Sequence, residues 1–322
     1  MPNRDPGPGP GSVTPLLRLA HLAMAAATEH LSRGYAALVA AFAAAPAPPP
    51  AEPPRELAAA AERQAEAAMR ARIRREYPGH AIAGEVLGAA GDCEWLWALD
   101  ALDGTGALLR TARAEAFGSA PADPAPAFGV TVAVVHRDRP VAGVVGQLRP
   151  GAGGLGLSRV WSGAAGQPTT CDGAPVFPGS AAGLAHATMA TTAPEVMFGT
   201  RASWSSFQAL RERTAALVAE QNCVGFMRLL GGGVEIAAER DLALPDAAAL
   251  VPVLRGAGVV VTDHDGRPPR FDAGARDGEY ALLAAPPALH GAALTVLRAG
   301  VADDRNTFAL GPAPRGYRRK FG

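Results

Sequence analysis

The chain opens with a long segment in which apolar positions recur with a helical period. Residues 14–44 are rich in Ala and Leu, and Thr14 and Pro15 are typical of the N-cap and first residue of a helix. Polar residues interrupt the run, which suits an amphipathic core helix. They also leave no apolar stretch of about 18 residues, so we expect no membrane span.

A second helical pattern follows a proline-rich break. Residues 46–54 can form neither helix nor central strand, so we expect a loop there. Residues 55–77 are dense in Ala, Glu and Arg, and Pro78-Gly79 ends the helix that they predict. The two helices lead to a strand that ends at Gly84-Glu85.

The pattern then changes to short apolar runs typical of strands. A buried strand is predicted at residues 96–99, and residues 111–127 are expected to form a long, partly irregular loop. Further strands follow in a meander, with turns rich in Gly, Asp and Pro. Their predicted positions are residues 129–135, 141–145 and about 160–161. The glycine-rich residues 151–156 fit a hairpin better than a phosphate loop, because no Lys-Ser/Thr follows.

The second half alternates strand and helix, which is an α/β pattern. Strands are predicted at residues 187–191, 234–238, 259–262 and 280–284. Helices are predicted at residues 204–220, 247–255 and 288–297.

One stretch combines a buried strand with chemistry. Asp100 and Asp103 lie at its end, and Gly104-Thr105 begins a predicted helix. The two carboxylates can share a hard cation, and amides at a helix start can hold an anion such as phosphate. The alternative is that Asp103 or Thr105 only caps the helix.

Composition narrows the function without naming it. The 322 residues are 48% hydrophobic, and Lys+Arg and Asp+Glu both number 30, so no basic field attracts nucleic acid. Three separated cysteines without a C-x-x-C pair argue against a thiolate zinc site and fit a reducing cytoplasm. We expect residues 1–13 to be a disordered tail and residues 311–322 a solvated basic tail, with nucleic-acid binding there a minor alternative.

Three motifs together resemble the inositol monophosphatase family of metal-dependent phosphatases. The stretch from Trp97 to Thr105 is similar to the signature W-x-x-D-P-I-D-G-T, with Ala101 in place of Pro. The segment ending in Gly84-Glu85 resembles Gly-Glu-Glu, and Asp246-Ala247-Ala248 resembles the W-D-x-A-A element. Residues 191–198 and 261–268 are most similar to the histidinol-phosphatase branch.

The resemblance implies a fold and a set of ligands. The fold is α+β and α/β, a five-layered αβαβα sandwich with an N-terminal half at residues 14–185 and a C-terminal half at 186–310. The implied metal ligands are the carboxylates of Glu85, Asp100, Asp103 and Asp246 and the carbonyl of Leu102. Four carboxylates in one cleft repel, so the cluster needs cations, and oxygen-only ligands point to Mg²⁺.

The resemblance also implies the reaction, hydrolysis of a phosphomonoester by metal-activated water. Catalytic roles fall to Thr105, which orients the water, and to Glu85 and Asp103. Gly104 and Thr105 bind phosphate. Glu239 and Asn222 are candidate substrate contacts, although Glu239 could instead be a solvated acid at a strand end.

Several residues depart from the family pattern. Val86 stands at the second Glu and Pro245 at the aromatic residue before Asp246. Glu62 is in place of an upstream Asp that supports a further metal, and Ala59 is in place of a Thr; Asn222 replaces a substrate-contacting Asp. We therefore expect slow hydrolysis of common phosphomonoesters.

Three hypotheses follow. The first is a Mg²⁺-dependent phosphomonoesterase acting on a small phosphorylated metabolite, such as histidinol phosphate or a sugar or cyclitol phosphate. The second is a member of the family repurposed for another reaction in specialised metabolism, and the third is a non-catalytic homologue that binds a ligand. We expect a homodimer in the cytoplasm, with no membrane or nucleic-acid partner.

Overall fold

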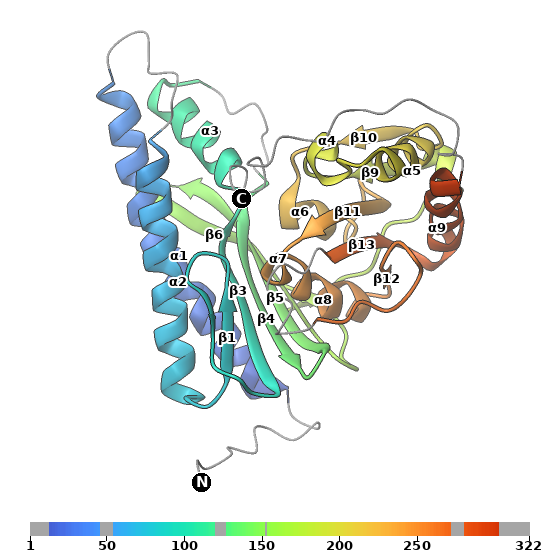
Figure 1. The fold of residues 1–322 in the computed structure, drawn as a ribbon. Coiled ribbons are helices and arrows are strands. Elements are labelled where there is room, and N and C mark those ends of the chain that lie inside the picture. The colour runs from blue at the N-terminus through green and yellow to red at the C-terminus, as the bar shows by residue number, and fades with distance from the viewer. Residues whose placement is uncertain (1–12, 46–53, 120–126, 152, 272–279, 303–322) are drawn as a thin grey trace.

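The computed structural model describes residues 13–45, 54–119, 127–151, 153–271 and 280–302. These residues form five layers in which helices and sheets alternate (Figure 1). The outer helices on one side are α1 (Thr14–Ala43), α2 (Arg55–Glu76) and α3 (Thr105–Ala116). The middle layer holds α6 (Asn222–Met227), α7 (Leu244–Ala248) and α8 (Leu250–Gly256). On the far side lie η1 (Leu184–His186), α4 (Pro194–Met197), α5 (Arg201–Arg211) and α9 (Pro287–Ala302). The expected αβαβα sandwich is confirmed.

The first sheet has the order β2-β1-β3-β4-β5-β6-β7-β8. Strands β1 and β3 are parallel, and the other neighbours are antiparallel. The strands are β1 (Ala81–Gly84), β2 (Gly88–Ala90), β3 (Trp95–Asp103), β4 (Gly129–His136), β5 (Arg139–Gly151), β6 (Gly154–Ala164), β7 (Thr170–Cys171) and β8 (Ala174–Pro175). The predicted meander is therefore present, and the glycine-rich turn joins the β5–β6 hairpin.

The second sheet has the order β10-β9-β11-β13-β12. Strands β10, β9 and β11 are mutually parallel, and β13 runs antiparallel to both of its neighbours. The strands are β9 (Thr188–Ala190), β10 (Ala216–Val218), β11 (Ile236–Leu242), β12 (Val260–Thr262) and β13 (Tyr280–Ala285).

Side-chain alternation along β3 sorts residues between two cores. Trp97 and Leu99 are fully buried in the core that contains α1 and α2, whereas Leu96 and Ala98 are buried in the core between the two sheets. Successive residues of a strand point to opposite faces. Asp100 therefore points, like Ala98, toward the middle layer.

A row of small residues crosses the first sheet on that same face. The register pairs Ala83 with Ala98, Ala98 with Ala133, Ala133 with Gly143, and Gly143 with Gly163. Helices α7 and α8 pack over these strands. A Cβ on Gly143 would lie 2.3 Å from the Ala249 carbonyl oxygen, so the helices approach the sheet backbone directly.

Four local predictions were wrong. Val13 rather than Thr14 is the N-cap of α1, without a side-chain cap hydrogen bond. Part of the expected 111–127 loop is helix, because α3 continues to Ala116. The helix predicted at 204–220 ends at Arg211 and gives way to β10, which pairs with β9. The helix predicted at 247–255 is two short helices that meet at Ala249.

Other predictions fall outside the described residues. These are the 1–13 tail up to residue 12, the proline-rich loop up to residue 53, and the basic tail at 311–322.

Candidate metal centre and adjoining cavity

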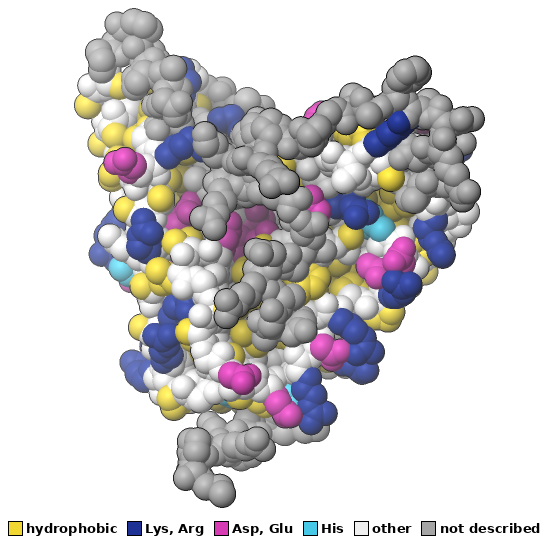
Figure 2. Space-filling view, viewed as in Figure 1, with side chains coloured by type: hydrophobic (Ala, Val, Ile, Leu, Met, Phe, Trp, Pro, Cys, Tyr) yellow, Lys and Arg dark blue, Asp and Glu magenta, His cyan; other side chains and the backbone are white. Residues whose placement is uncertain are grey.

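Three carboxylates from distant parts of the chain converge in the middle of the molecule. Glu85, Asp100 and Asp246 each offer one oxygen, and these oxygens all lie within 4.8 Å of one another. Figure 2 shows acidic side chains gathered near the middle of this face, between the two halves of the molecule. The structure thus brings together three of the four carboxylates expected to bind metal.

Backbone pairing explains how they meet. Glu85 follows β1, and its N–H donates to the Leu99 carbonyl at 3.2 Å, which places it beside Asp100 on β3. Thr131 of β4 is the register partner of Asp100, and its hydroxyl donates to the Pro245 carbonyl at 3.0 Å. That bond fixes the start of α7, and with it Asp246, over the same point of the sheet.

Without a bound cation, the carboxylates of this group repel one another. Burial, followed by repulsion from Glu85 and Asp246, raises the pKa of Asp100 well above its usual range. Burial and the charges of Glu85 and Asp103 do the same to the pKa of Asp246. Burial, with the charge of Asp103, raises the pKa of Glu85 to about 7. Ionised together, these carboxylates need a compensating positive charge.

The hydrogen bonding of the Asp100 carboxylate indicates whether a cation fits this group. Asp100 Oδ1 accepts the Leu102 N–H at 2.8 Å, but Oδ2 is buried and has no hydrogen-bond partner among the described residues. A buried carboxylate oxygen of this kind is normally satisfied by a donor or a metal. Oxygen-only ligands suit Mg²⁺, Ca²⁺ or Mn²⁺, so the residues fit a hard divalent cation.

Asp103 and Leu102 lie beside the group of three. Oxygen Oδ2 of Asp103 accepts the Cys223 N–H at 2.5 Å, which ties the end of β3 to α6. The register of β3 against β4 shifts between Asp100 and Asp103, so Leu102 lies in an irregular turn of the strand. Their roles as ligands stay predictions.

Gly104 and Thr105 begin α3 at the edge of the site. Gly104 has a φ of 101°, and a Cβ there would lie 2.6 Å from Asn222 Nδ2. Only glycine meets both conditions. The Thr105 hydroxyl donates to Glu62 Oε1 at 2.5 Å, so Glu62 contacts Thr105 and lies outside the group of three carboxylates.

A cavity of about 650 Å³ opens next to Gly104 and Asn222. Asn222 has a φ of 47°, and its side-chain N–H donates to the Ala127 carbonyl at 2.7 Å. Arg110 and Glu220 also line the cavity and form an ion pair at 2.8 Å. The remaining lining residues are Gly106, Ala107, Thr192, Ala193, Pro194, Glu195, Val196, Leu217 and Ala219.

Glu239 is buried, which excludes the alternative of a solvated acid. Its carboxylate accepts hydrogen bonds from Thr192 at 2.8 Å and Thr191 at 3.2 Å, and burial raises its pKa to about 8. The charge of Asp103 also contributes to the raised pKa of Glu239. Its role in substrate binding stays a prediction.

Sequence reasoning missed Arg110 and Glu220 at the cavity. The sequence pattern predicts only that Arg110 lies in the helix that Gly104-Thr105 begins and that Glu220 ends a helix at 204–220. The structure instead places Glu220 just after β10. The signal available was the spacing of Gly106 and Arg110, which lie one turn apart on the same side of α3.

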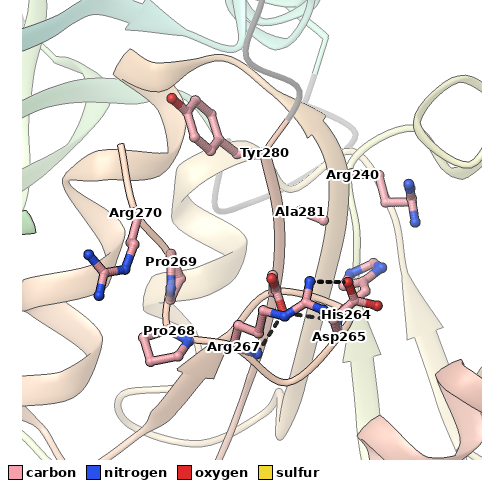
Figure 3. Close-up of a pocket in the computed structure, with 10 residues that line it drawn as sticks. Arg240, His264, Asp265, Arg267, Pro268, Pro269, Arg270, Tyr280 and Ala281 are labelled. Carbon is pink, nitrogen blue, oxygen red and sulfur yellow. Dashed lines mark hydrogen bonds and ion pairs between the residues drawn. The ribbon is translucent and has the colours of Figure 1, made fainter. Parts of the chain in front are cut away.

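A second cavity, of about 610 Å³, lies farther along the second sheet (Figure 3). Arg240, the residue after Glu239, lines it together with His264 and Arg270. Asp265 and Arg267 form an exposed ion pair at its edge, at 2.7 Å. The arginine side chains that Figure 3 labels point in different directions.

Among the helices that the structure describes, none is both long and apolar enough to cross a bilayer.

The layers and the acidic group define an αβαβα protein with a candidate site for a hard cation between its two sheets. The inositol monophosphatase family matches residues 13–301 of the chain. The chain belongs to the inositol monophosphatase family.

Individual relatives agree with this assignment. An inositol monophosphatase structure from Zymomonas mobilis is 28% identical, with a TM-score of 0.66, and the match covers 89% of this chain and 99% of that one. An inositol monophosphatase from Anabaena is 22% identical, with a TM-score of 0.63 over 89% and 96% of the two chains, and shares the fold. The bifunctional phosphatase IMPL2, chloroplastic, of Arabidopsis thaliana is 29% identical over 210 residues. That match covers 64% of this chain and spans about half, 54%, of the curated relative.

Proposed function

We propose that the protein is a Mg²⁺-dependent phosphomonoesterase that acts on a small phosphorylated metabolite. The observations that carry the proposal are the convergence of Glu85, Asp100 and Asp246 and the unsatisfied buried Oδ2 of Asp100. Family membership supports the reaction class. The Asp103 carboxylate and the Leu102 carbonyl complete the proposed ligand set. When bound, Mg²⁺ would supply Lewis-acid polarisation of the ester and activation of a water.

The residues of this chain have separate tasks in the proposal. The N–H groups of Gly104 and Thr105 bind the phosphate, where the first turn of α3 favours an anion. The Thr105 hydroxyl, held by Glu62, orients the water. Glu62 has a raised pKa, mainly because of burial, which suits a group that takes up a proton.

The cavity beside Gly104 accepts the rest of the substrate in this proposal. Asn222 lines the cavity and contacts the polar groups of the substrate, and Glu239 supports this contact from behind Thr192, which also lines the cavity. The apolar lining covers the carbon skeleton. Histidinol phosphate, a sugar phosphate and a cyclitol phosphate are the candidate substrates. The relatives carry the words inositol monophosphatase or bifunctional phosphatase in their names, which supports phosphate esters as a class.

The test is phosphate release from a panel of phosphomonoesters with Mg²⁺ and with EDTA. We expect Mg²⁺-dependent release that Asp100→Asn removes. A matched control is Asp92→Asn, since Asp92 is exposed and outside the group. Tight Mg²⁺ binding without any hydrolysis would favour a family member repurposed for another reaction, and loss of both would favour a non-catalytic ligand-binding homologue.

We also propose that the protein is a homodimer and that each subunit consists of two halves, residues 14–185 and residues 186–310. The first sheet is built from residues before 176, and the second begins at Thr188. Light scattering at micromolar protein measures the mass, and a monomer mass would contradict the dimer.

A further inference from the structure

Among the three clustered carboxylates, Glu85 has the least regular backbone. Asp100 lies within a central strand and Asp246 in the first turn of a helix, whereas Glu85 begins the three-residue turn between β1 and β2. The pairing of Gly84 with Gly88 closes this turn. Such a turn does not by itself hold a side chain to the accuracy that a metal site requires.

A buried carboxylate on α2 occupies the inside of the turn. Glu66 is fully buried, and its Oε2 accepts the Val86 N–H at 2.7 Å. Both of its oxygens accept the Leu87 N–H at 3.2 Å. Two of the three amides in the turn are therefore bound to one side chain.

An arginine completes the contact from the same helix. Arg70 lies one helical turn after Glu66, and its Nε donates to Glu66 Oε1 at 2.7 Å with both side chains buried. A second guanidinium nitrogen donates to the Gly88 carbonyl, at the far end of the turn. The ion pair thus holds the amides inside the turn and the carbonyl that closes it.

The strand is shaped to admit this pair. A Cβ on Gly84 would lie 1.9 Å from Glu66 Oε1, so the carboxylate occupies the space that any other side chain would take. Both Glu66 oxygens are engaged by N–H donors, and Glu66 does not belong to the group of three convergent carboxylates. Glu66 therefore contacts the turn that carries Glu85, and it is not one of the three clustered carboxylates.

We infer that the buried Glu66–Arg70 pair positions Glu85 by ordering the turn at residues 85–87. The inference rests on the proposed function, because it assigns the turn a role in holding the metal ligand. It also gives residue 86 a role through its backbone N–H, although Val86 lacks the carboxylate of the family pattern. Outer-shell partners of metal ligands typically contribute about 10–100-fold to metal affinity.

The experiment measures Mg²⁺ affinity by calorimetry and amide exchange by NMR in the full chain. Glu66→Gln keeps the size of the side chain but loses the charge. The double variant Glu66→Met with Arg70→Met removes both charges, which avoids leaving one buried charge unpaired. Ile73→Val is the control, because Ile73 is fully buried on the same helix but belongs to the core.

We expect both test variants to bind Mg²⁺ about 10–100-fold more weakly and to exchange the Val86 and Leu87 amides faster in EDTA. Ile73→Val should bind within about twofold of the wild type, since a loss of stability alone does not move the turn. A folded double variant with wild-type Mg²⁺ affinity would overturn the inference.

Two measurements on the wild type cover the remaining cases. If neither test variant folds, the Val86 and Leu87 amides of the wild type must still be protected in EDTA, and rapid exchange there would refute the role of Glu66. If the wild type binds no divalent cation, the proposed function fails first, and the exchange data still show whether Glu66 orders the turn.

Discussion

The hydroxyl of Thr105 donates a hydrogen bond to Glu62 Oε1 at 2.5 Å, which joins the start of α3 to α2. The family pattern has the shorter Asp where this chain has Glu62. The longer side chain of Glu62 reaches Thr105, so the hydroxyl has an acidic hydrogen-bond partner in this chain.

Shortening Glu62 should therefore reduce the proposed activity. Glu62→Asp draws the carboxylate back by one methylene, and a displacement of about 1 Å in a catalytic contact can lower the rate about 100-fold. Glu62→Gln keeps the reach but not the charge and should also be slow. Steady-state kinetics measure kcat, with Glu56→Asp on the exposed first turn of α2 as control. Faster turnover in Glu62→Asp would contradict the assigned role.

Asp100→Asn should change stability in opposite directions with and without metal. In EDTA the variant should melt higher, because the buried member of a group of mutually repelling carboxylates has lost its charge. For the wild type, Mg²⁺ at about 100 times its Kd should add about 2.7 kcal/mol to the free energy of unfolding. The variant should lose most of that gain. Calorimetric melts in EDTA and in Mg²⁺ test both signs, and an unchanged Mg²⁺ response would exclude Asp100 as a ligand.

Two glycines of the α3 start should respond differently to alanine. Gly104→Ala places a Cβ 2.6 Å from Asn222 Nδ2 at a φ of 101°. We therefore expect the free energy of unfolding to fall by about 1–3 kcal/mol. We expect the proposed activity to fall as well. Gly106→Ala meets only Arg110, at 3.5 Å, and should gain up to about 1 kcal/mol from helix propensity. Urea melts of the two variants measure the change in the free energy of unfolding, and equal changes would contradict the prediction.

The ion pair across the cavity should affect substrate binding more than stability. The Arg110 and Glu220 side chains are 57% and 67% exposed, and exposed pairs contribute about 0–1 kcal/mol. Arg110→Ala and Glu220→Gln should therefore leave the melting temperature nearly unchanged but shift KM, because both residues line the cavity. The exposed Arg18–Glu76 pair on the first two helices is the control. If KM is unchanged in both variants, the substrate does not reach the ion pair.

Acid sensitivity should be traceable to His264. Burial, with a contribution from the charge of Arg240, lowers its pKa from 6.5 to about 4. The unfolded chain then binds a proton that the folded chain rejects, so stability is present above pH 6.5 and falls as the pH drops toward 4. Between pH 7 and pH 5 the wild type should lose about 2 kcal/mol more than His264→Gln. Urea melts at both pH values measure this difference, with the exposed His186→Gln as control. A parallel loss in His264→Gln would contradict it.

The sequence predicted the parts of the site that depend on local pattern. The buried strand before Asp100 is a continuous apolar run, and Gly104-Thr105 marks the helix start, so β3 and α3 could be placed without tertiary information. The convergence of Glu85, Asp100 and Asp246 depends on sheet pairing and on α7, and only the resemblance to a family predicted it.

Tertiary pairing also explains the largest error in the fold. Residues 212–220 carry Ala, Glu and Leu, which favour helix, yet Ala216–Val218 pair in parallel with β9. Strand partners override a weak helical preference. The Glu66–Arg70 contact was not predictable for a related reason, since a Glu and Arg at i,i+4 usually lie on an exposed helical face.

The row of small residues from Ala83 to Gly163 determines the separation between the first sheet and the helices of the middle layer. They determine how close the backbone of α8 comes to the sheet, and α8 continues directly from the helix that carries Asp246. Adding even one methyl group at Gly143 would lift this helix pair away from the strand that carries Asp100. The distance between the carboxylate of Asp246 and that of Asp100 therefore depends partly on alanines and glycines that are not themselves metal-ligand candidates.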